Sequence, residues 1–544
     1  MARDASYSCY ASKSLMRPPC DQAVITAQSA STPCGRQQGM WVLVAAIVAS
    51  SMAFIDSTVV NVALPALQSS FGASVVGVQW VVEAYGLTLA ALILVGGSMG
   101  DLFGRRRMFL LGVTLFAIAS AACGFAATIQ QLIAARAVQG IGAAFLVPGS
   151  LALISASFGE ADRGRAIGTW SGFTAITTAI GPVLGGWLIE HLSWRWAFLI
   201  NIPLAAAVMV VSLWRVPESR ATHAGRIDWL GAAVATFSLT ALVFGFVESS
   251  SLGWRNPVVG CAIAAGVVGV IAFLRIEAKS DSPMVPLALF RSPSFAGANL
   301  LTFFLYSAIG MFFFVFLLNL IQVQGYSATS AGGAVLPMIL LLFLLSRWSG
   351  GLVTRYGARL PLIVGPLVTA LGFFLFSIPS IGGSYWRTFF PAILMLGFGM
   401  AVSVAPLTTV VMNAVDQDHV GTASGINNAV ARLAGVLAIA VMGVVMVADF
   451  SAHLGKELAS VPMPSGARAS LQSGENKLAG LRSPDGLDRQ TSTAVESSIG
   501  SAFVASFRLI MWICAALSLA SAAVAWRWIP GTAKVSIPKT AVAA

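Results

Sequence analysis

The sequence predicts an all-α integral membrane protein with 14 transmembrane helices. Three observations lead to this prediction: the composition, the length of the apolar runs and the placement of the basic residues. Of the 544 residues, 57% are hydrophobic and only 10% are charged, whereas soluble domains carry about 25% charged residues. This composition excludes a soluble protein with an unusually large core.

Fourteen apolar runs are long enough to cross a bilayer, which takes roughly 20 residues of α-helix. Six runs lie in the N-terminal part of the chain, two follow, and six lie in the C-terminal part. We expect helices near 41–63, 77–98, 108–127, 131–156, 164–188, 197–214, 229–247, 257–274, 297–320, 332–353, 360–379, 389–412, 420–447 and 503–527.

Basic residues indicate how these helices are oriented. The net charge of +11 comes from short loops and not from one basic domain, so it indicates membrane topology and no nucleic-acid partner. The loops 64–76, 128–130 and 321–331 carry no Lys or Arg. Because short cytoplasmic loops are enriched in these residues, we expect a multi-pass protein of the cell (inner) membrane with both chain ends in the cytoplasm.

The runs and the composition divide the chain into five segments. We expect a disordered cytoplasmic tail (1–39), an N-terminal six-helix bundle (40–215), two inserted helices (216–285), a C-terminal six-helix bundle (286–530) and a second cytoplasmic tail (531–544). The external loop 448–502 is polar and without periodicity, so we expect it to be flexible. The cysteines of the first tail lack metal-ligand spacing, and no metal site is expected.

Residues 97–107 read Gly-Ser-Met-Gly-Asp-Leu-Phe-Gly-Arg-Arg-Arg and join two predicted spans. Glycine allows the chain to turn sharply here, and one acid among three arginines can form an ion pair that breaks as helices move. A simple positive-inside anchor would explain the arginines but not the acid or the glycine spacing. The candidate gating motif therefore consists of Gly97, Asp101, Gly104, Arg105 and Arg106.

Residues 350–359 repeat part of this loop between a later pair of spans. Gly357 matches Gly104 and Arg359 matches Arg106, whereas Thr354 stands in the place of the acid. A degraded second copy indicates two related six-span halves, with the inserted helix pair between them. The alternative is that Gly and Arg recur in any cytoplasmic turn.

Ionisable residues inside the predicted spans are the candidates for proton coupling. At 1.5 Å per residue, Asp56, Glu83 and Arg136 lie at a similar depth in the outer half of the membrane. Charges there usually face a bundle interior or a cavity, so we expect a buried cluster in which Asp56 is the coupling acid. The alternatives are a helix cap for Asp56 and an interfacial position for Glu83. For Arg136 the alternative is a structural pairing with Gln139 or a helix carbonyl.

The C-terminal spans differ from the N-terminal spans in their charges. Arg432 lies near the middle of its span, and no acid stands near it in the sequence. We find no Asp or Glu near the middle of any C-terminal span.

Several of these motifs resemble those of the major facilitator superfamily. Residues 97–107 are similar to its Gly-x-Leu-Ala-Asp-x-x-Gly-Arg-Lys loop. Residues 136–144, Arg-Ala-Val-Gln-Gly-Ile-Gly-Ala-Ala, are similar to its fourth-span motif, whose arginine is linked with proton transfer in that family. The resemblance therefore implies that Arg136 tunes a proton-carrying acid.

The fifth span contains a further resemblance, to the Gly-Pro-x-x-Gly-Gly antiporter motif of exporters. Its matching residues are Gly181, Pro182, Gly185 and Gly186. Thr177 stands where the family motif usually has one more glycine, so the match is incomplete. Proline kinks a helix and glycines permit close helix contact, so we expect a hinge in this span.

Two more segments narrow the resemblance to the 14-span drug:proton antiporters (EmrB/QacA type). They are Asp56-x-x-x-x-Asn61-x-x-x-Pro65 and Ser-Trp-Arg-Trp-Ala-Phe-Leu-Ile-Asn-Ile-Pro at 193–203. The resemblance covers about 40–530. It implies a proton-coupled secondary active exporter of hydrophobic or amphiphilic drugs and toxic compounds.

Other functions fit the sequence less well. A proton symporter or an exporter of a single metabolite remains the alternative within transport. A membrane sensor would need an output domain, for which neither tail is long enough. We find no HExxH, GxSxG or phosphate-binding Gly-Lys-Ser/Thr motif, so we expect no enzyme, no catalytic residue and no cofactor, with the proton gradient as energy source. The expected partners are a small-molecule substrate, protons and the lipid bilayer, and a periplasmic adaptor protein is left open.

Overall fold

The computed structural model of the chain describes residues 36–158, 160–220, 228–280, 283–415 and 420–530. These residues form helices and their connections, and no strand occurs among them. Fourteen of the described helical segments are long and apolar enough to cross a membrane, which confirms the predicted fold class. The predicted tails fall largely outside the described residues, except that the first helix already begins at Arg36.

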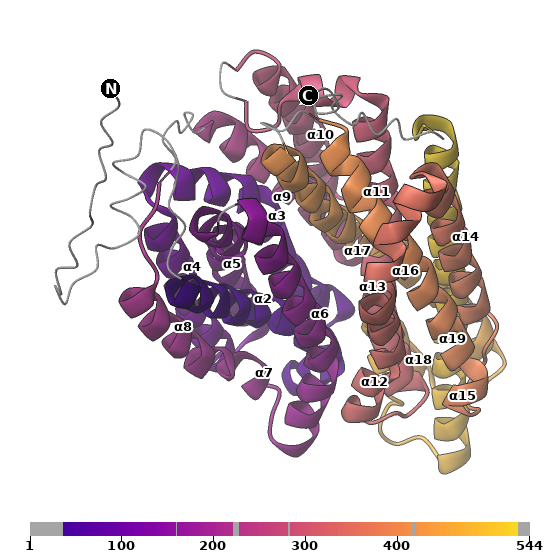
Figure 1. The fold of residues 1–544 in the computed structure, drawn as a ribbon. Helices are drawn as coiled ribbons and strands as arrows, with labels where there is room; N and C mark the ends of the chain where they lie inside the picture. Colours follow the sequence, from indigo (N-terminus) through magenta and orange to yellow (C-terminus); the bar gives the residue numbers. More distant parts are fainter. Residues whose placement is uncertain (1–35, 159, 221–227, 281–282, 416–419, 531–544) are drawn as a thin grey trace, which may run out of the picture.

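The first six spans are built from α2 to α8 (Figure 1). Their bounds are α2 Arg36–Phe71, α3 Val75–Phe103, α4 Arg105–Gly124, α5 Ile129–Ser157, α6 Glu160–His191, α7 Trp196–Leu199 and α8 Asn201–Arg215. Short polar side chains fix where spans begin. The Ser74 hydroxyl accepts a hydrogen bond from the Gly77 amide, and the Thr128 hydroxyl accepts one from the Gln131 amide, as N-caps do.

The remaining eight spans follow in order. Their bounds are α9 Trp229–Leu252, α10 Pro257–Glu277, α11 Pro293–Leu318, α12 Ala328–Ala334, α13 Leu336–Tyr356, α14 Arg359–Phe376, α16 Phe390–Asn413, α17 Val420–Ala459 and α19 Arg489–Trp528. The π-helix η2 (Asn319–Val323) extends α11, and α12 and α13 together make one span. Short helices lie in the connections, namely η1 Leu287–Arg291, α15 Tyr385–Thr388, α18 Ser465–Ser473 and η4 Glu475–Gly480.

The two sets of six spans pack their helices in the same pairs. In the first set, α2 packs on α6 and α8, while α3 and α4 pack on α5. In the second set, α11 packs on α17 and α19, while α13 and α14 pack on α16. The additional helices α9 and α10 pack on each other, and α9 also contacts α3 and α17, one helix from each set. We call α2–α8 the N-terminal half and α11–α19 the C-terminal half.

The bundle has two ends. We call the end with α7, α12, α15 and α18, at the bottom of Figure 1, the α7 end. The opposite end, where α3 turns into α4 at Gly104, is the Gly104 end.

Residues 448–502 differ from the flexible loop that we expected. The helix α17 continues to Ala459 and α19 begins at Arg489, so the connection between the two helices is only 460–488. Within it, three leucines are buried in the main core at the α7 end: Leu471, Leu478 and Leu481. The Gln68 amide Nε2 also donates to the Lys477 carbonyl at 2.9 Å. The polar composition of this segment predicted a flexible loop, but a few irregularly spaced leucines anchor it to the core.

Candidate functional site

A buried ion pair joins α2 and α5. The Arg136 Nη1 lies 2.5 Å from the Asp56 Oδ2, and the side chains are 1% and 0% exposed. The structure thus brings together two of the three predicted ionisable residues. Asp56 lies well inside α2, so it is not a helix cap.

Neutral polar side chains surround the Asp56 carboxylate. Its Oδ1 accepts hydrogen bonds from the Gln139 Nε2 at 2.8 Å and from the Asn201 Nδ2 at 3.2 Å. The Ser120 hydroxyl accepts from the same two amides, at 3.2 and 3.0 Å, and donates to the Phe198 carbonyl at 2.8 Å. We call Asp56, Arg136, Gln139, Asn201 and Ser120 the Asp56 network.

Two members of this network, Asn201 and Ser120, were not predicted from the sequence. Asn201 stands in the segment 193–203 that supports the family resemblance, but its direction toward Asp56 could not be read from the sequence. Ser120 is one of many small polar residues in apolar runs and gives no signal of its own. Both side chains are completely buried.

The remaining groups around Arg136 leave its guanidinium well satisfied. Its Nη1 also donates to the Gln139 Oε1 at 2.7 Å, and its Nε donates to the Val81 carbonyl at 3.1 Å. The guanidinium carbon lies 4.1 Å from the centre of the Tyr85 ring, a cation–π distance. The pairing with Gln139 and a helix carbonyl therefore exists in addition to the ion pair.

Glu83 is buried but does not join the Asp56 network. Its side chain is 0% exposed, which contradicts an interfacial position. Among the described residues, neither carboxylate oxygen has a hydrogen-bond partner. The expected cluster of three is thus a network around Asp56 with Glu83 apart from it.

A cavity of about 1150 Å³ lies between the N-terminal and C-terminal halves. Side chains from α2, α3, α5 and α6 line one side, and side chains from α11, α13, α16 and α17 line the other. The walls are mainly apolar, with the aromatic residues Phe54, Tyr85, Tyr306, Phe313 and Phe343. The charged residues on the lining are Glu83, Arg136 and Arg432. Glu83 and Arg136, two of the predicted ionisable residues, therefore face the same large cavity.

The α7 end of this cavity is closed by direct contact between the halves. A Cβ atom at Gly186 would lie only 2.6 Å from the Cα of Thr329, and one at Gly332 would overlap the Pro182 carbonyl. The Thr329 hydroxyl donates to the Glu190 carboxylate at 2.6 Å. Glycine is needed at 186 and 332 because backbone meets backbone there.

The other glycines of the antiporter motif pack α6 within its own half. A Cβ at Gly181 would overlap the Thr58 hydroxyl, and one at Gly185 would lie 2.7 Å from a methyl group of Val59, both on α2. Pro182 is inside α6 and lines the cavity. The motif therefore holds α6 against α2 on one face and against α12 on the other.

The candidate gating motif lies at the Gly104 end. The Arg105 Nη2 lies 2.8 Å from the Asp101 Oδ1, and the two side chains are 20% and 42% exposed. A Cβ at Gly97 would be in ordinary contact, at 3.7 Å, with Pro148 of α5. The predicted ion pair exists, and it joins the end of α3 to the start of α4.

Gly104 makes the turn between these helices with φ of 111°, a region that favours glycine. The Glu218 carboxylate lies against this glycine and accepts hydrogen bonds from the amides of Arg106, at 3.0 Å, and Arg107, at 3.2 Å. Glu218 thus satisfies the free amides at the start of α4. Nothing in the sequence singles it out, since Glu218 lies 112 residues after Arg106 in the chain.

The second copy of the motif has the same backbone arrangement. Gly357 has φ of 73°, and the Arg359 Nη2 donates to the Trp526 carbonyl in α19 at 2.5 Å. In the first copy, the Arg106 Nη1 donates to the Val216 carbonyl, directly after α8, at 2.9 Å. The helices α8 and α19 occupy matching places in the two halves. The two copies of the motif therefore share both their residues and the hydrogen bonds that their arginines make.

Asp449 is an acid that our predicted span limits left outside the membrane helix. It lies in α17, which continues beyond the predicted end at 447. The Ser506 hydroxyl donates to its Oδ2 at 2.8 Å, and the His453 Nδ1 lies 3.2 Å from the same oxygen. Asp449 is not among the residues that line the cavity.

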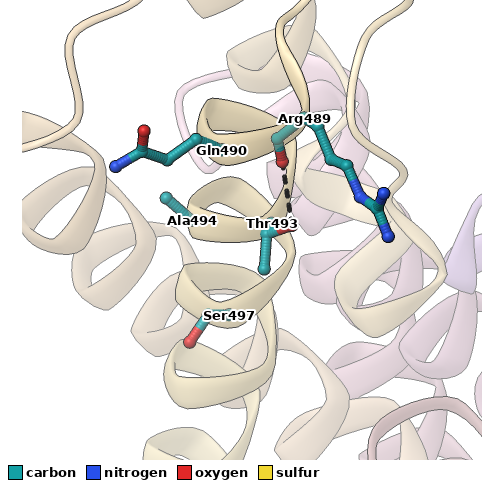
Figure 2. A pocket seen from close by; sticks show the side chains of 5 residues that line it. All are labelled: Arg489, Gln490, Thr493, Ala494 and Ser497. Atoms are coloured by element: carbon teal, nitrogen blue, oxygen red, sulfur yellow. Dashed lines mark hydrogen bonds between the residues drawn. The ribbon is translucent and has the colours of Figure 1, made fainter.

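A second hollow lies on the first turns of α19 and is shown in Figure 2. Its lining comes from one helix, and Arg489 and Gln490 point away from each other. The Thr493 hydroxyl donates to the Arg489 carbonyl at 2.9 Å, an ordinary bond within a helix. No group of three or more His, Cys, Asp or Glu side chains that could hold a metal occurs in the described part of the chain.

Comparison with known proteins assigns the family. Residues 46–439 match the profile of the Major Facilitator Superfamily. The chain belongs to the Major Facilitator Superfamily. It is 38% identical, over 76% of its length and 77% of the relative, to the multidrug resistance protein Stp of Mycobacterium tuberculosis. It is 32% identical, over 91% and 93%, to the tetracenomycin C resistance and export protein of Streptomyces glaucescens.

Solved structures show the same superfamily fold. A bacterial homologue of the human lysosomal transporter Spinster, in an inward-facing conformation, matches with a TM-score of 0.60 and 18% identity, over 90% of this chain and 98% of that one. A D-xylose–proton symporter matches with a TM-score of 0.59 and 14% identity, over 90% and 98%. Family and fold together are those of a multi-pass membrane transporter of small molecules, and not of an enzyme.

Proposed function

We propose that this chain is a proton-coupled exporter of hydrophobic or amphiphilic compounds, antibiotics among them. The observation that carries the proposal is that the Asp56 network borders a large, mainly apolar cavity between the two halves. The names of three relatives support export: multidrug resistance protein Stp, tetracenomycin C resistance and export protein, and cephamycin export protein of Amycolatopsis lactamdurans.

Asp56 is the proposed coupling acid because its charge organises the network. As a carboxylate it accepts hydrogen bonds from Arg136, Gln139 and Asn201. A proton on Asp56 removes the counter-charge of Arg136, and a buried guanidinium without a counter-charge is costly. The network must then rearrange, which gives the protonated and deprotonated states different preferred conformations.

Tyr85 connects this change to the substrate. Its ring lies against the Arg136 guanidinium and also lines the cavity. A movement of Arg136 therefore changes the cavity wall. In exchange transport, the proton and the exported compound each favour one of two opposed conformations, and Tyr85 is placed to sense both.

Glu83 is the proposed second acid. Because its oxygens have no described protein partner and the residue lines the cavity, the partner of this carboxyl group must come from the cavity contents. Water or a polar group of the substrate can act as this partner, and a bound proton can neutralise the carboxylate. Replacing Glu83 by Gln should therefore change how many protons are released per bound substrate.

The test of coupling is substrate-induced proton release from the solubilised protein at several pH values. Asp56→Asn should abolish the release and allow the protein to reach the membrane in normal amount. The matched control is Asp449→Asn, which changes an acid of α17 outside the cavity and should release protons as the native chain does. Unchanged proton release from Asp56→Asn would remove Asp56 from the coupling role.

The direction of transport needs its own measurement. Export predicts that an imposed proton gradient drives accumulation of the compound in everted membrane vesicles, and that a protonophore abolishes it. Accumulation only in right-side-out vesicles would instead identify a symporter. An exporter of a single metabolite would be recognised by a failure to transport chemically unrelated toxic compounds.

A further inference from the structure

Arg432 is a cation of the cavity wall without a described partner. It lies on α17 and lines the cavity from the C-terminal half. Among the described residues, no hydrogen bond or ion pair engages its guanidinium, and the phenols of Tyr85 and Tyr306 line the same cavity. This position differs from that of Arg136, whose charge Asp56 balances.

The difference between the two arginines determines what each can bind. The guanidinium of Arg136 already holds a carboxylate, an amide oxygen and a backbone carbonyl. The guanidinium of Arg432 keeps five N–H donors in a planar fork, a geometry that matches a carboxylate. Since an unpaired charge inside a membrane is costly, a ligand that brings a negative group to Arg432 gains more than its neutral analogue.

Aromatic side chains from both halves line the same cavity as Arg432. Tyr85 belongs to α3 and Tyr306 to α11, and both line the cavity. Phe54 and Phe313 extend the aromatic wall. Rings of this kind favour flat aromatic ligands through stacked or edge-to-face contacts.

We propose that Arg432, Tyr85 and Tyr306 form the subsite for the acidic group of an aromatic substrate, such as an aromatic carboxylate or phenolate. This inference rests on the proposed function, because it takes the cavity to be the substrate cavity. The volume of about 1150 Å³ is at or above the upper end of ordinary ligand pockets, about 300–1000 Å³. Molecules with several fused rings therefore fit the space.

The test compares three probes that differ in charge and share one ring system: 2-naphthoate, 2-naphthalenemethanol and 2-naphthylmethylamine. Equilibrium binding to the purified full chain in a neutral detergent is measured by calorimetry. The native chain should bind the naphthoate more tightly than the alcohol. Arg432→Gln should weaken naphthoate binding at least about tenfold, leave the alcohol unchanged and not weaken the amine.

Two control variants make the result specific. Arg387→Gln removes an arginine of α15 that is not on the cavity lining, and it should bind all three probes as the native chain does. Arg432→Lys keeps the charge without the planar fork, so it should retain part of the preference for naphthoate. Unchanged alcohol binding in Arg432→Gln shows that this variant has folded.

Three outcomes would overturn the proposal. The first is a native chain that binds the alcohol as tightly as the naphthoate. The second is an equal loss of all three probes in Arg432→Gln. The third is competition in which phosphatidylglycerol, added to the micelles, displaces naphthoate completely, since a lipid phosphate would then be the ligand of Arg432. None of these binding measurements depends on proton coupling. If the Asp56→Asn test failed, they would still decide whether Arg432 binds the acidic group.

Discussion

Gly186→Ala should shift the transporter away from the conformation that is closed at the α7 end. The new Cβ would overlap the Ala328 carbonyl oxygen and lie 2.6 Å from the Cα of Thr329, and ordinary contact begins at 3.4 Å, so the two halves must separate locally by at least about 0.8 Å. Because both of these atoms belong to the backbone, neither can rotate away. Overpacking of this kind costs about 1–3 kcal/mol, which corresponds to a change of roughly 5- to 150-fold in the conformational equilibrium.

Thiol cross-linking across the α7 end measures this equilibrium. The Gln322 Nε2 donates to the Gln68 Oε1 at 2.8 Å, and the two residues belong to different halves. Because the two side chains meet at their tips, cysteines at these positions, in a chain without its native cysteines, should be joined by a short bifunctional thiol reagent in the parent, and not by a direct disulfide. Gly186→Ala should reduce the rate in proportion to the lost closed population.

Gly168→Ala is the matched control for this experiment. It lies on the same helix, and no described atom lies within 4 Å of the added Cβ. Gly168→Ala therefore shows the effect of the higher helix propensity of alanine alone, about 1 kcal/mol, because it adds no contact between the two halves. Equal cross-linking rates in the two variants would refute the argument that Gly186 permits closure.

Three further predictions concern the Gly104 end and the topology. Asp101→Asn should slow turnover and leave equilibrium substrate affinity nearly intact, since neither Asp101 nor Arg105 lines the cavity; loss of affinity at an unchanged rate would contradict this. Gly104→Ala should lower the midpoint of thermal unfolding, because φ of 111° costs a non-glycine residue about 1–3 kcal/mol and the new Cβ would lie 2.8 Å from the Glu218 carboxyl carbon. In intact cells, an impermeant thiol reagent should label a cysteine at 470 but reach one at 103 only after permeabilisation, and the reverse pattern would invert the orientation.

The order of spans and the pairing of Asp56 with Arg136 could be predicted because both depend on strong local signals. Long apolar runs give the spans. A charge within such a run must find an opposite charge or a cavity, so two charges at similar depth are expected to meet. The repeat at 350–359 could also be predicted from the sequence. In the structure, Arg106 and Arg359 donate to backbone carbonyls at matching places in the two halves.

The rest depends on contacts between residues distant in the chain. Glu218 caps α4 from a connection that has no motif, and Ser120 joins the Asp56 network through two amides on other helices. The limits of α17 were wrong for another reason. Beyond the membrane a helix can continue in polar sequence, and hydropathy then marks the apolar core and not the end of the helix.

The helix pair α9 and α10 makes the two flanks of the cavity unequal. On one flank, α3 meets α17, and α9 packs over both. On the other flank, α6 meets α13 without such a cover from α9 or α10 in the described contacts. Leu344 of α13 is 68% exposed and still lines the cavity, and α6 carries the exposed apolar side chains of Phe173 and Ile180. If the chain exports lipid-soluble compounds as proposed, we expect them to enter the cavity from the side of the bilayer between α6 and α13, without first passing into water.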